Sequence, residues 1–389
     1  MKTVLLFLSL LASNTSLYSQ WEKVSSSAAN AIIVHNGVLF AGGERGARRS
    51  TDNGNSWVTI NNGLHGNLID VAIESFHSYH DQLLVGTKYW EGIFTTSDSG
   101  NTWMHRTSGS IVPSFASNNN YIFSTPTNAA ISRSIDSGKT WHPSANGFGH
   151  MFSNGQRSPT AIAIGYNGTY FFAGTAYGEI FRSSDNGDSW DSVYHGQTFP
   201  IINLLKSNGP IIYAGIDGSI YRSTDDGITW ELVKNDFGVY TIYSLNGIVF
   251  AGGYRGVIRS NDNGDNWVMI NDGLADSSSV YSITANEEYM FIATYSSIYR
   301  RKLFELHTTK SLRNNSLSLS AYPNPATKEL TISHASGQAE RVVMYDMTGA
   351  LVRSGVVEGE TTWDVSALSS GTYMLGIPGG KMQMVQVVK

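Results

Sequence analysis

Aspartate side chains recur in this 389-residue chain at regular spacing. Such carboxylates can bind metal ions, transfer protons or hold turns together. Six of them lie on average about 42 residues apart, a period typical of propeller blades, and they are Asp52, Asp98, Asp136, Asp185, Asp225 and Asp262. Each stands in an eight-residue stretch close to Ser-x-Asp-x-Gly-x-Ser/Thr-Trp, which we call the box. No box has the ligand spacing of an EF-hand calcium loop, so a structural role is favoured over a metal role.

The box has the composition of a strand, a tight turn and a second strand. Its Asp can accept hydrogen bonds from backbone amides two residues on, its Gly supplies a positive φ, and its Trp anchors the next strand. A run rich in β-branched and aromatic residues precedes each box, and a seventh run follows the last box. These runs are residues 38–42, 83–87, 121–125, 170–175, 211–215, 248–252 and 290–294.

Seven runs with six boxes predict an all-β protein whose main part, residues 20–306, is a seven-bladed β-propeller. The seventh unit has Leu303 where the box Asp would be, and it has no outer strand of its own. Residues 21–24 resemble the strand that follows each box. We therefore expect the N-terminal strand to complete the last blade, which leaves no long free sheet edge. Closure by residues 301–306 is the alternative.

The boxes resemble the Asp-box, or BNR repeat, of sialidases, xyloglucanase-like glycoside hydrolases, sortilin-type receptors and photosystem II assembly factors, all of which are β-propellers. In that family the box forms the turn between the third and fourth strands of a blade, on the face away from the active site. The resemblance implies that the six aspartates are structural. It also implies that a functional site lies on the opposite face.

The N-terminal residues and the composition bear on where the protein works. Residues 1–19 carry one Lys, an apolar run at 4–11 and a polar, small-residue end, which is typical of a signal peptide. No other stretch reaches the length of an apolar membrane span. The net charge of −5 gives no electrostatic signature of nucleic-acid binding. The lack of cysteine excludes disulfides, cysteine-ligated metals and a lipoprotein anchor.

The C-terminal residues form a separate module. Residues 307–318 are rich in Ser, Thr, Asn and Lys and are typical of a linker, whereas residues 319–389 predict a small immunoglobulin-like β-sandwich. The Tyr-Pro-Asn-Pro-Ala sequence at 322–326, the Tyr-Asp-x-x-Gly sequence at 345–349, the Asp-Val-Ser-x-Leu-x-x-Gly-x-Tyr run at 364–373 and the Val-Val-Lys end closely resemble the sorting domain of type IX secretion substrates in Bacteroidetes. The resemblance implies export by the type IX machinery. The domain would then be cleaved, and the propeller would be released or attached to the cell surface.

The loops opposite the boxes hold the candidate ligand-binding residues. Trp90 is the one tryptophan that neither the blade strands nor the sorting module explains, and it could stack on a sugar ring or cover the adjacent blade. The remaining candidates are aromatic or charged residues in equivalent loops and in the loops between blades. The full set is Tyr89, Trp90, Tyr177, Tyr254, Arg255, His65 and His195.

An enzymatic role has less support in the sequence. A glycosidase needs two suitably placed carboxylates, and Glu44, Glu91, Glu179 and Asp217 are available, but nothing in the sequence selects two of them. The sialidase Arg-Ile-Pro motif is absent. Arginines recur at one position of successive repeats, which favours a structural role; they are Arg49, Arg133, Arg182, Arg222, Arg259 and Arg300, with Thr95 in the second repeat. His77 and His80 could bind a metal, although a solvated loop is the favoured interpretation.

We therefore predict a secreted or cell-surface, non-catalytic propeller that binds a glycan or protein ligand on the face opposite the boxes. No catalytic residue, cofactor or metal is predicted. The alternatives are an extracellular glycoside hydrolase of unrecognised type and a scaffold for a surface complex.

Overall fold

The structure, a computed structural model, describes residues 20–65, 71–127, 130–151, 157–158, 160–195, 201–275, 278–306, 319–334, 339–346, 351–376 and 382–389. The expected signal peptide, 1–19, and the expected linker, 307–318, lie outside these residues.

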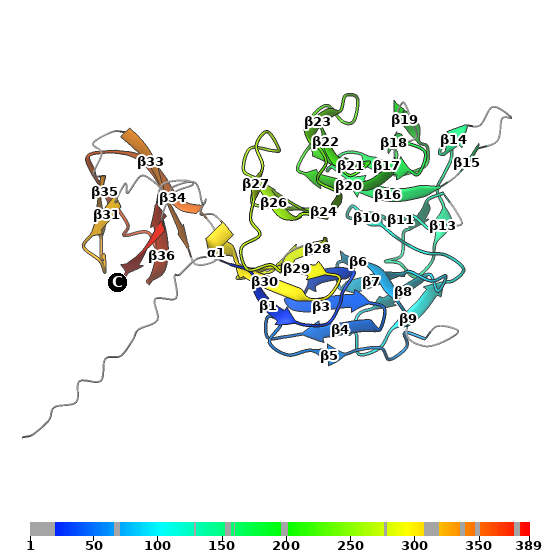
Figure 1. Cartoon of the computed structure of the whole chain (residues 1–389), viewed down its shortest axis with the longest axis horizontal. Helices are drawn as coiled ribbons and strands as arrows, with labels where there is room; N and C mark the ends of the chain where they lie inside the picture. The colour runs from blue at the N-terminus through cyan, green and yellow to red at the C-terminus, as the bar shows by residue number, and fades with distance from the viewer. Residues whose placement is uncertain are drawn as a thin grey trace, which may run out of the picture.

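Seven four-stranded antiparallel sheets form in the described part of residues 20–306, and we call them blades 1 to 7 in chain order (Figure 1). Blades 1 to 3 contain β2 (Ala31–His35), β3 (Val38–Gly43), β4 (Gly46–Ser50) and β5 (Val58–Thr59); β6 (Ile73–Tyr79), β7 (Gln82–Thr87), β8 (Ile93–Thr96) and β9 (Met104–Thr107); and β10 (Phe115–Ser117), β11 (Ile122–Ser124), β12 (Ser132–Ser134) and β13 (His142–Pro143). A small hairpin follows blade 3, made of β14 (His150–Met151) and β15 (Arg157–Ser158).

The later blades repeat this order of strands. Blades 4 to 6 contain β16 (Ala161–Tyr166), β17 (Phe171–Thr175), β18 (Glu179–Ser183) and β19 (Asp191–His195); β20 (Ile202–Asn208), β21 (Ile211–Ile216), β22 (Ser219–Ser223) and β23 (Glu231–Lys234); and β24 (Val239–Leu245), β25 (Ile248–Gly253), β26 (Gly256–Ser260) and β27 (Val268–Met269). Blade 7 contains β28 (Val280–Ala285), β29 (Tyr289–Thr294), β30 (Ile298–Lys302) and, from the other end of the propeller, β1 (Glu22–Ser25).

The first strands of successive blades contact each other in a closed circle, from β2 through β6, β10, β16, β20 and β24 to β28 and back to β2. At the last junction Ile32 N donates to Ser282 Oγ and Val34 N donates to Thr284 Oγ1, both at 3.1 Å. Large side chains of the second strands, such as Phe40, are fully buried between blades. Burial of one such side chain contributes about 1.5–3 kcal/mol. The sequence prediction of a β-propeller is therefore confirmed.

The N-terminal strand closes the ring, as the sequence predicted. β1 pairs antiparallel with β30, and Glu22 lies opposite Arg300. The Arg300 guanidinium also donates to both carboxylate oxygens of Glu22, at 2.9 and 3.2 Å. Trp21 is 2% exposed, and its Nε1 donates to Ile270 O of blade 6 at 2.7 Å. The box tryptophan Trp103 makes the equivalent bond to the blade before it, so Trp21 acts as the tryptophan of blade 7.

The box turns are held together by their aspartates. In blade 5, Asp225 Oδ1 accepts from Thr229 N at 2.9 Å, and its Oδ2 accepts from Thr229 Oγ1 at 2.6 Å. Ser223 Oγ donates to the same carboxylate at 2.8 Å and accepts from Gly227 N at 2.8 Å. Gly227 has φ +82°, a conformation that disfavours a side chain. All six boxes contain the equivalent bonds to the aspartate.

These bonds predict an acid-dependent loss of stability. Hydrogen bonds from Thr229 and Ser223 lower the pKa of Asp225, and those from Ser56 and Ser50 lower the pKa of Asp52 from 3.8 to about 2. A carboxyl group with a depressed pKa stabilises the fold above its unfolded pKa, and that contribution is lost as the pH falls through the folded value. We therefore expect the melting temperature to fall steeply between about pH 4 and pH 2. A melting temperature that stayed constant over this range would contradict the assignment.

The C-terminal part has two sheets, in the orders β31-β32-β35 and β34-β33-β36-β37. The strands are β31 (Leu319–Tyr322), β32 (Glu329–His334), β33 (Ala339–Asp346), β34 (Leu351–Glu358), β35 (Glu360–Asp364), β36 (Gly371–Gly376) and β37 (Met382–Val387). One buried cluster contains Leu330 and Trp363 of the first sheet with Met344 and Leu375 of the second. The one helix in the described residues, α1 (Leu303–Leu306), follows β30, and no described helix is long and apolar enough to cross a membrane.

Candidate ligand-binding face

The two ends of each third strand define two faces of the propeller. The strand begins at a loop from the second strand and ends at the box turn. Lys88, in such a loop of blade 2, contacts Glu44 in the equivalent loop of blade 1, and Tyr254 N bonds to Gly238 O in the connection that precedes blade 6. These loops and the connections between blades therefore lie together. We call this side the loop face and the other side the box face.

Tyr89 and Trp90 are exposed aromatic residues that follow one another in a loop of the loop face. Tyr89 Oη donates to Glu44 Oε2 at 3.1 Å, Lys88 Nζ pairs with Glu44 Oε1 at 2.6 Å, and Lys88 lies over the Tyr89 ring. Trp90 is 60% exposed and has φ +56°, a backbone conformation that is rare for bulky residues. Its carbonyl accepts from Gly109 N at 2.7 Å. An exposed indole on a fixed backbone is suited to contact a ligand.

The other predicted residues lie farther round the ring. Tyr254 is 64% exposed, and its neighbour Arg255 is also exposed in blade 6. Tyr177 is half-buried, with its backbone N bonded to Thr175 Oγ1. His195 Nε2 and Ser192 Oγ are hydrogen-bonded at 2.8 Å, and His195 Nδ1 lies 3.4 Å from Glu179 Oε1.

His65 is exposed after blade 1. The predicted residues are thus spread over blades 1, 2, 4 and 6 of the described part. Among them, Tyr89 donates to a side chain of another blade, Glu44 of blade 1.

The loop-face ends of the first strands carry further residues that the sequence did not predict. β6, β16, β20, β24 and β28 each have an irregularity after their first paired residue. A bulge leaves one residue unpaired and re-aims its side chain. The residues in these positions are Glu74, Ile162, Asn203, Tyr240 and Tyr281. The rings of Tyr240 and Tyr281 stack with centroids 5.2 Å apart, which joins blades 6 and 7. No Gly or Pro stands at these bulges, so the sequence carries no signal of their positions.

Glu74 and Glu44 have carboxyl groups in contrasting environments. Burial raises the pKa of Glu74. The positive charge of Lys88 opposes this shift, and the negative charge of Glu44 adds to it. The hydrogen bond from Lys88 lowers the pKa of Glu44. Of these two residues, Glu44 but not Glu74 was predicted from the sequence as a candidate carboxylate for a glycosidase.

The three other nominated carboxylates lie apart. Glu91 in blade 2 accepts from His105 Nε2 through its backbone oxygen, Glu179 contacts His195 in blade 4, and Asp217 stands in a turn of blade 5.

The two histidines considered as metal ligands contact blade 3 separately. His77 Nε2 lies 2.9 Å from Ser117 Oγ, and its ring stacks on Phe115. His80 Nε2 lies 3.3 Å from Asn119 O. Burial lowers the pKa of His77 to about 3, and the charge of Lys206 adds to the effect. The described residues contain no group of three His, Asp or Glu side chains that could hold a metal ion.

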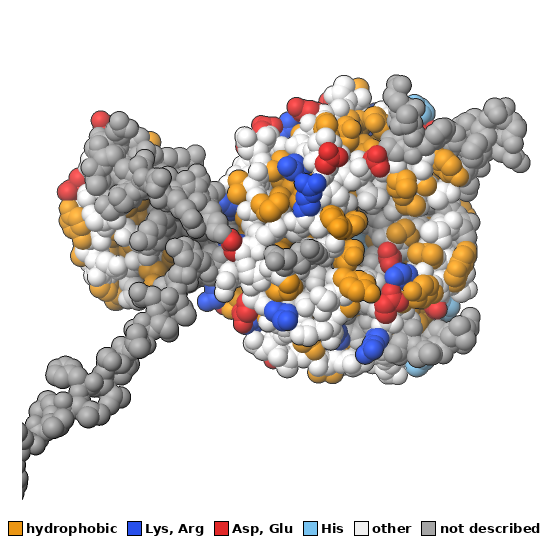
Figure 2. Space-filling view, in the orientation of Figure 1, with side chains coloured by type: hydrophobic (Ala, Val, Ile, Leu, Met, Phe, Trp, Pro, Cys, Tyr) orange, Lys and Arg blue, Asp and Glu red, His pale blue; other side chains and the backbone are white. Residues whose placement is uncertain are grey.

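The surface drawn in Figure 2 shows separate groups of hydrophobic side chains on the propeller, with Lys, Arg, Asp and Glu side chains between them. Neither sign of charge dominates this view. A ligand with both apolar and hydrogen-bonding groups fits such a surface better than a polyanion does.

The C-terminal module matches a known family. Residues 320–388 match the family described as secretion system C-terminal sorting domain. The sequence prediction of this domain is confirmed, and such a domain directs interaction with the type IX secretion machinery and export to the cell surface or the extracellular space. A search of curated proteins finds no match.

Solved structures share the propeller fold. The chain is similar to YCF48 bound to D1 peptide, with TM-score 0.57 and 16% identity over 73% of this chain and 95% of that one. It is also similar to the GH74 xyloglucanase from Xanthomonas campestris, with TM-score 0.58 and 14% identity over 81% of this chain. A third similar structure is PorZ of Porphyromonas gingivalis, described as an essential bacterial surface component of the type IX secretion system, with TM-score 0.53 and 16% identity over 93% of this chain. The match spans 59% of the xyloglucanase and 60% of PorZ. The chain is therefore an exported β-propeller that carries a type IX sorting domain at its C-terminal end.

Proposed function

We propose that this protein is a non-catalytic binding module of the cell surface or extracellular space whose propeller takes a glycan on the loop face. The observation that carries the proposal is Trp90, an exposed indole on a backbone of unusual φ that a neighbouring loop fixes. Keeping a large apolar ring in water has a cost, and a bound partner removes that cost. Backbone strain of this kind also concentrates at functional sites.

Sugar chemistry fits the groups around this ring. The C–H face of a pyranose stacks on an aromatic ring, while its hydroxyl groups need nearby donors and acceptors. Tyr89, Glu44 and Lys88 supply such groups beside Trp90. The stacked Tyr240–Tyr281 pair and the exposed Tyr254 and Tyr295 add further rings on the same face. An extended glycan could contact several of these sites, whereas a monosaccharide would contact one.

The sorting domain supports exposure to extracellular ligands, because export brings the propeller to the side of the envelope where polysaccharides lie. A peptide is the alternative ligand for the same face, since the similar YCF48 structure is described as bound to a peptide. If the protein were instead a scaffold in a surface complex, affinity purification from the native envelope would recover a protein partner in stoichiometric amount.

Glycoside hydrolysis is a second candidate because of Glu74 and Glu44. Glycosidases pair a carboxyl group of raised pKa, the acid, with a second carboxylate that stays ionised. Burial raises the pKa of Glu74, and the Lys88 hydrogen bond lowers that of Glu44. If hydrolysis occurred, Glu74 would be the acid and Glu44 the nucleophile or base.

The double substitution Trp90→Ala with Tyr254→Ala tests the binding face. We expect the double substitution to weaken polysaccharide binding roughly 10- to 100-fold relative to the wild-type chain, because central aromatic contacts often dominate the binding energy of an interface. The matched control is Ile135→Ala with Ile228→Ala, which removes two exposed apolar side chains from box turns. Calorimetric titration of wild type, double variant and control gives the affinities. Equal affinity in all three proteins would place the ligand elsewhere.

A further inference from the structure

The blade arginines bind the box turn of the next blade. Six third strands carry an arginine in one register, opposite a large aromatic residue of the second strand. Five of these arginines donate from Nη1 to the main-chain oxygen of the residue after the next box aspartate. The pairs are Arg49 with Ser99 at 2.5 Å, Arg133 with Asn186 at 2.6 Å, Arg182 with Asp226 at 2.7 Å, Arg222 with Asn263 at 2.8 Å and Arg300 with Asn53 at 2.8 Å.

Three of these arginines bind a second oxygen of the same turn. Arg133 donates to Asp188 Oδ1 and Arg222 to Asp265 Oδ1, both at 2.7 Å. Arg300 donates to Asn55 Oδ1 at 3.0 Å. The second acceptor always lies two residues after the first. The preferred partner of this arginine is thus a turn that offers a carbonyl and, two residues on, a carboxylate or amide oxygen.

Arg259, the sixth arginine, has no such partner within the described part of the chain. It is 2% exposed, and its Nε, Nη1 and Nη2 atoms make no hydrogen bond to any residue that the structure describes. The next blade is blade 7, where Leu303 stands in place of the box aspartate and α1 begins. Burial lowers the pKa of Arg259 to about 10, and the charge of Arg301 adds to the effect, so the group still carries its charge at neutral pH. An uncompensated buried charge is costly.

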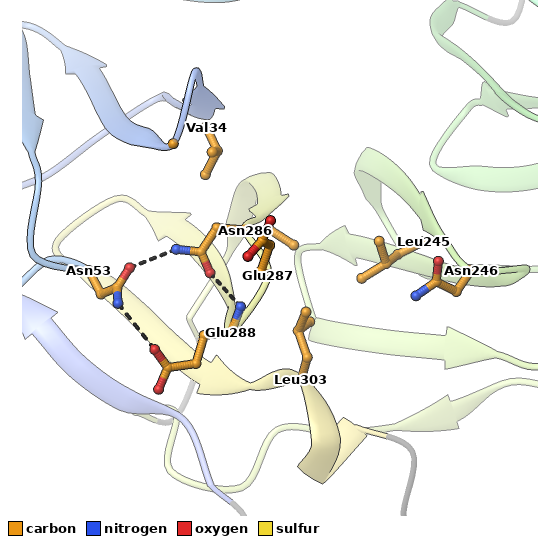
Figure 3. A pocket seen from close by; sticks show the side chains of 10 residues that line it. Val34, Asn53, Leu245, Asn246, Asn286, Glu287, Glu288 and Leu303 are labelled. Carbon is orange, nitrogen blue, oxygen red and sulfur yellow. Dashed lines mark hydrogen bonds between the residues drawn. The ribbon is translucent and has the colours of Figure 1, made fainter. Parts of the chain in front are cut away.

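A pocket lined by residues of blades 6, 7 and 1 lies on the box face beside Leu303, the residue at which the missing turn would begin. In four blades an Asn of the first hairpin donates to the side chain after the next box aspartate: Asn118 to Asn186, Asn167 to Asp226, Asn208 to Asn263 and Asn286 to Asn53. Leu245 holds this hairpin position in blade 6. Leu245 and Leu303 line a pocket of about 820 Å³ together with Val34 and Glu288. Figure 3 shows Leu303 between Leu245 and the hairpin that carries Glu288.

We propose that the junction of blades 6 and 7 binds an exposed turn of a partner protein, which supplies the seventh box turn that the described residues do not form. A main-chain carbonyl and a carboxylate two residues on would bind Arg259, and an adjacent apolar side chain would occupy the pocket between Leu245 and Leu303. Trp21 already supplies the tryptophan that follows such a turn in other blades. This site lies on the box face and is independent of the proposed glycan site.

Two neighbouring features define which turn can bind. Leu303 and Leu306 of α1 pack in one buried cluster with Val257 and Ile270 of blade 6, so α1 covers the junction and must shift when the turn enters. Glu287 and Glu288 stand at the pocket, and Asn53 donates to Glu288 at 3.4 Å. These acidic groups disfavour a strongly acidic segment. A turn with a single carboxylate, directed to Arg259, satisfies both conditions.

The test uses the full chain and a synthetic peptide with the sequence of residues 260–267, the turn that binds Arg222. Calorimetry should detect binding to the wild-type chain and a roughly 10- to 100-fold weaker affinity for Arg259→Met, the range expected when a hydrogen-bonded charge is removed. Arg222→Met is the matched control, because the turn that it contacts is present in the chain, and it should retain the peptide affinity. A peptide with alanine in place of Asp265 should bind more weakly.

Thermal melting without peptide gives a second readout. Arg259→Met should leave the melting temperature unchanged or raise it, because an unpaired buried charge is removed, while Arg222→Met should lower it. Equal peptide affinity in wild type and Arg259→Met would overturn the proposal. So would an equal loss of melting temperature in Arg259→Met and Arg222→Met, which would mean that Arg259 has a partner in the folded chain. If acetate alone raised the melting temperature of the wild-type chain as much as the peptide does, and had no such effect on Arg259→Met, the site would be a simple anion site and the proposal of a turn site would be wrong.

Discussion

Trp21→Ala is expected to lower the free energy of unfolding by about 3–5 kcal/mol, the usual cost of truncating a buried tryptophan. Trp21 is almost completely buried, bonds to Ile270 O and packs in one cluster with Leu303 and Leu306. It also begins the segment that closes the ring, since β1 pairs with β30. Its loss removes core packing and weakens the contact between the two ends of the propeller. Denaturant unfolding of the full chain, followed by far-UV circular dichroism, measures the change.

Trp90→Ala is the matched control for this substitution. It removes the same side chain from an exposed loop and is expected to change the free energy of unfolding by no more than about 0.5 kcal/mol. If Trp21→Ala were no more destabilising than Trp90→Ala, closure by the N-terminal strand would not contribute to stability.

Asp185→Ala is expected to destabilise the chain by about 1–3 kcal/mol, because it leaves several donors without their acceptor. Asp185 accepts from Ser183 Oγ at 2.7 Å, Ser189 N at 2.9 Å and Ser189 Oγ at 2.6 Å. The same turn also presents Asn186 O to Arg133 and Gly187 O to Ser144, so its distortion weakens the junction with blade 3. The substitution should therefore affect a whole interface.

Asp191→Ala in the same blade is the control for Asp185→Ala. Asp191 is an exposed residue of β19, and its loss should have an effect within about 0.5 kcal/mol. Equal stabilities of Asp185→Ala and Asp191→Ala would show that the box aspartate is not a structural residue.

The parts of the fold that local chemistry dictates were accessible from the sequence. The box carries its own turn residues and its own anchor, so its six copies are enough to predict repeated hairpins. Trp21 could be recognised as half of a seventh repeat because residues 21–24 resemble the strand after each box. The sequence predicted a structural role for the recurring arginines, and in the structure five of the six bind the following blade.

The candidate site was less accessible, because it depends on register and on long-range neighbours. Glu74, Tyr240 and Tyr281 are set by bulges in the first strands, and no special residue type marks those bulges. The interaction of Lys88 and Tyr89 with Glu44 joins two blades, which sequence spacing does not reveal. The isolation of Arg259 could have been inferred from Leu303, since the lack of a seventh box also means the lack of an acceptor.

The most direct test of the account separates retention of a glycan from its cleavage. The full chain would be incubated with a panel of sialosides, β-glucans and other extracellular polysaccharides, and both retained ligand and released sugar would be measured. We expect the wild-type chain to retain at least one polysaccharide, the Trp90→Ala and Tyr254→Ala double variant to retain less of it, and neither protein to release sugar. Release of sugar by the wild-type chain, and its loss in Glu74→Gln and Glu44→Gln, would contradict the account and identify a glycoside hydrolase.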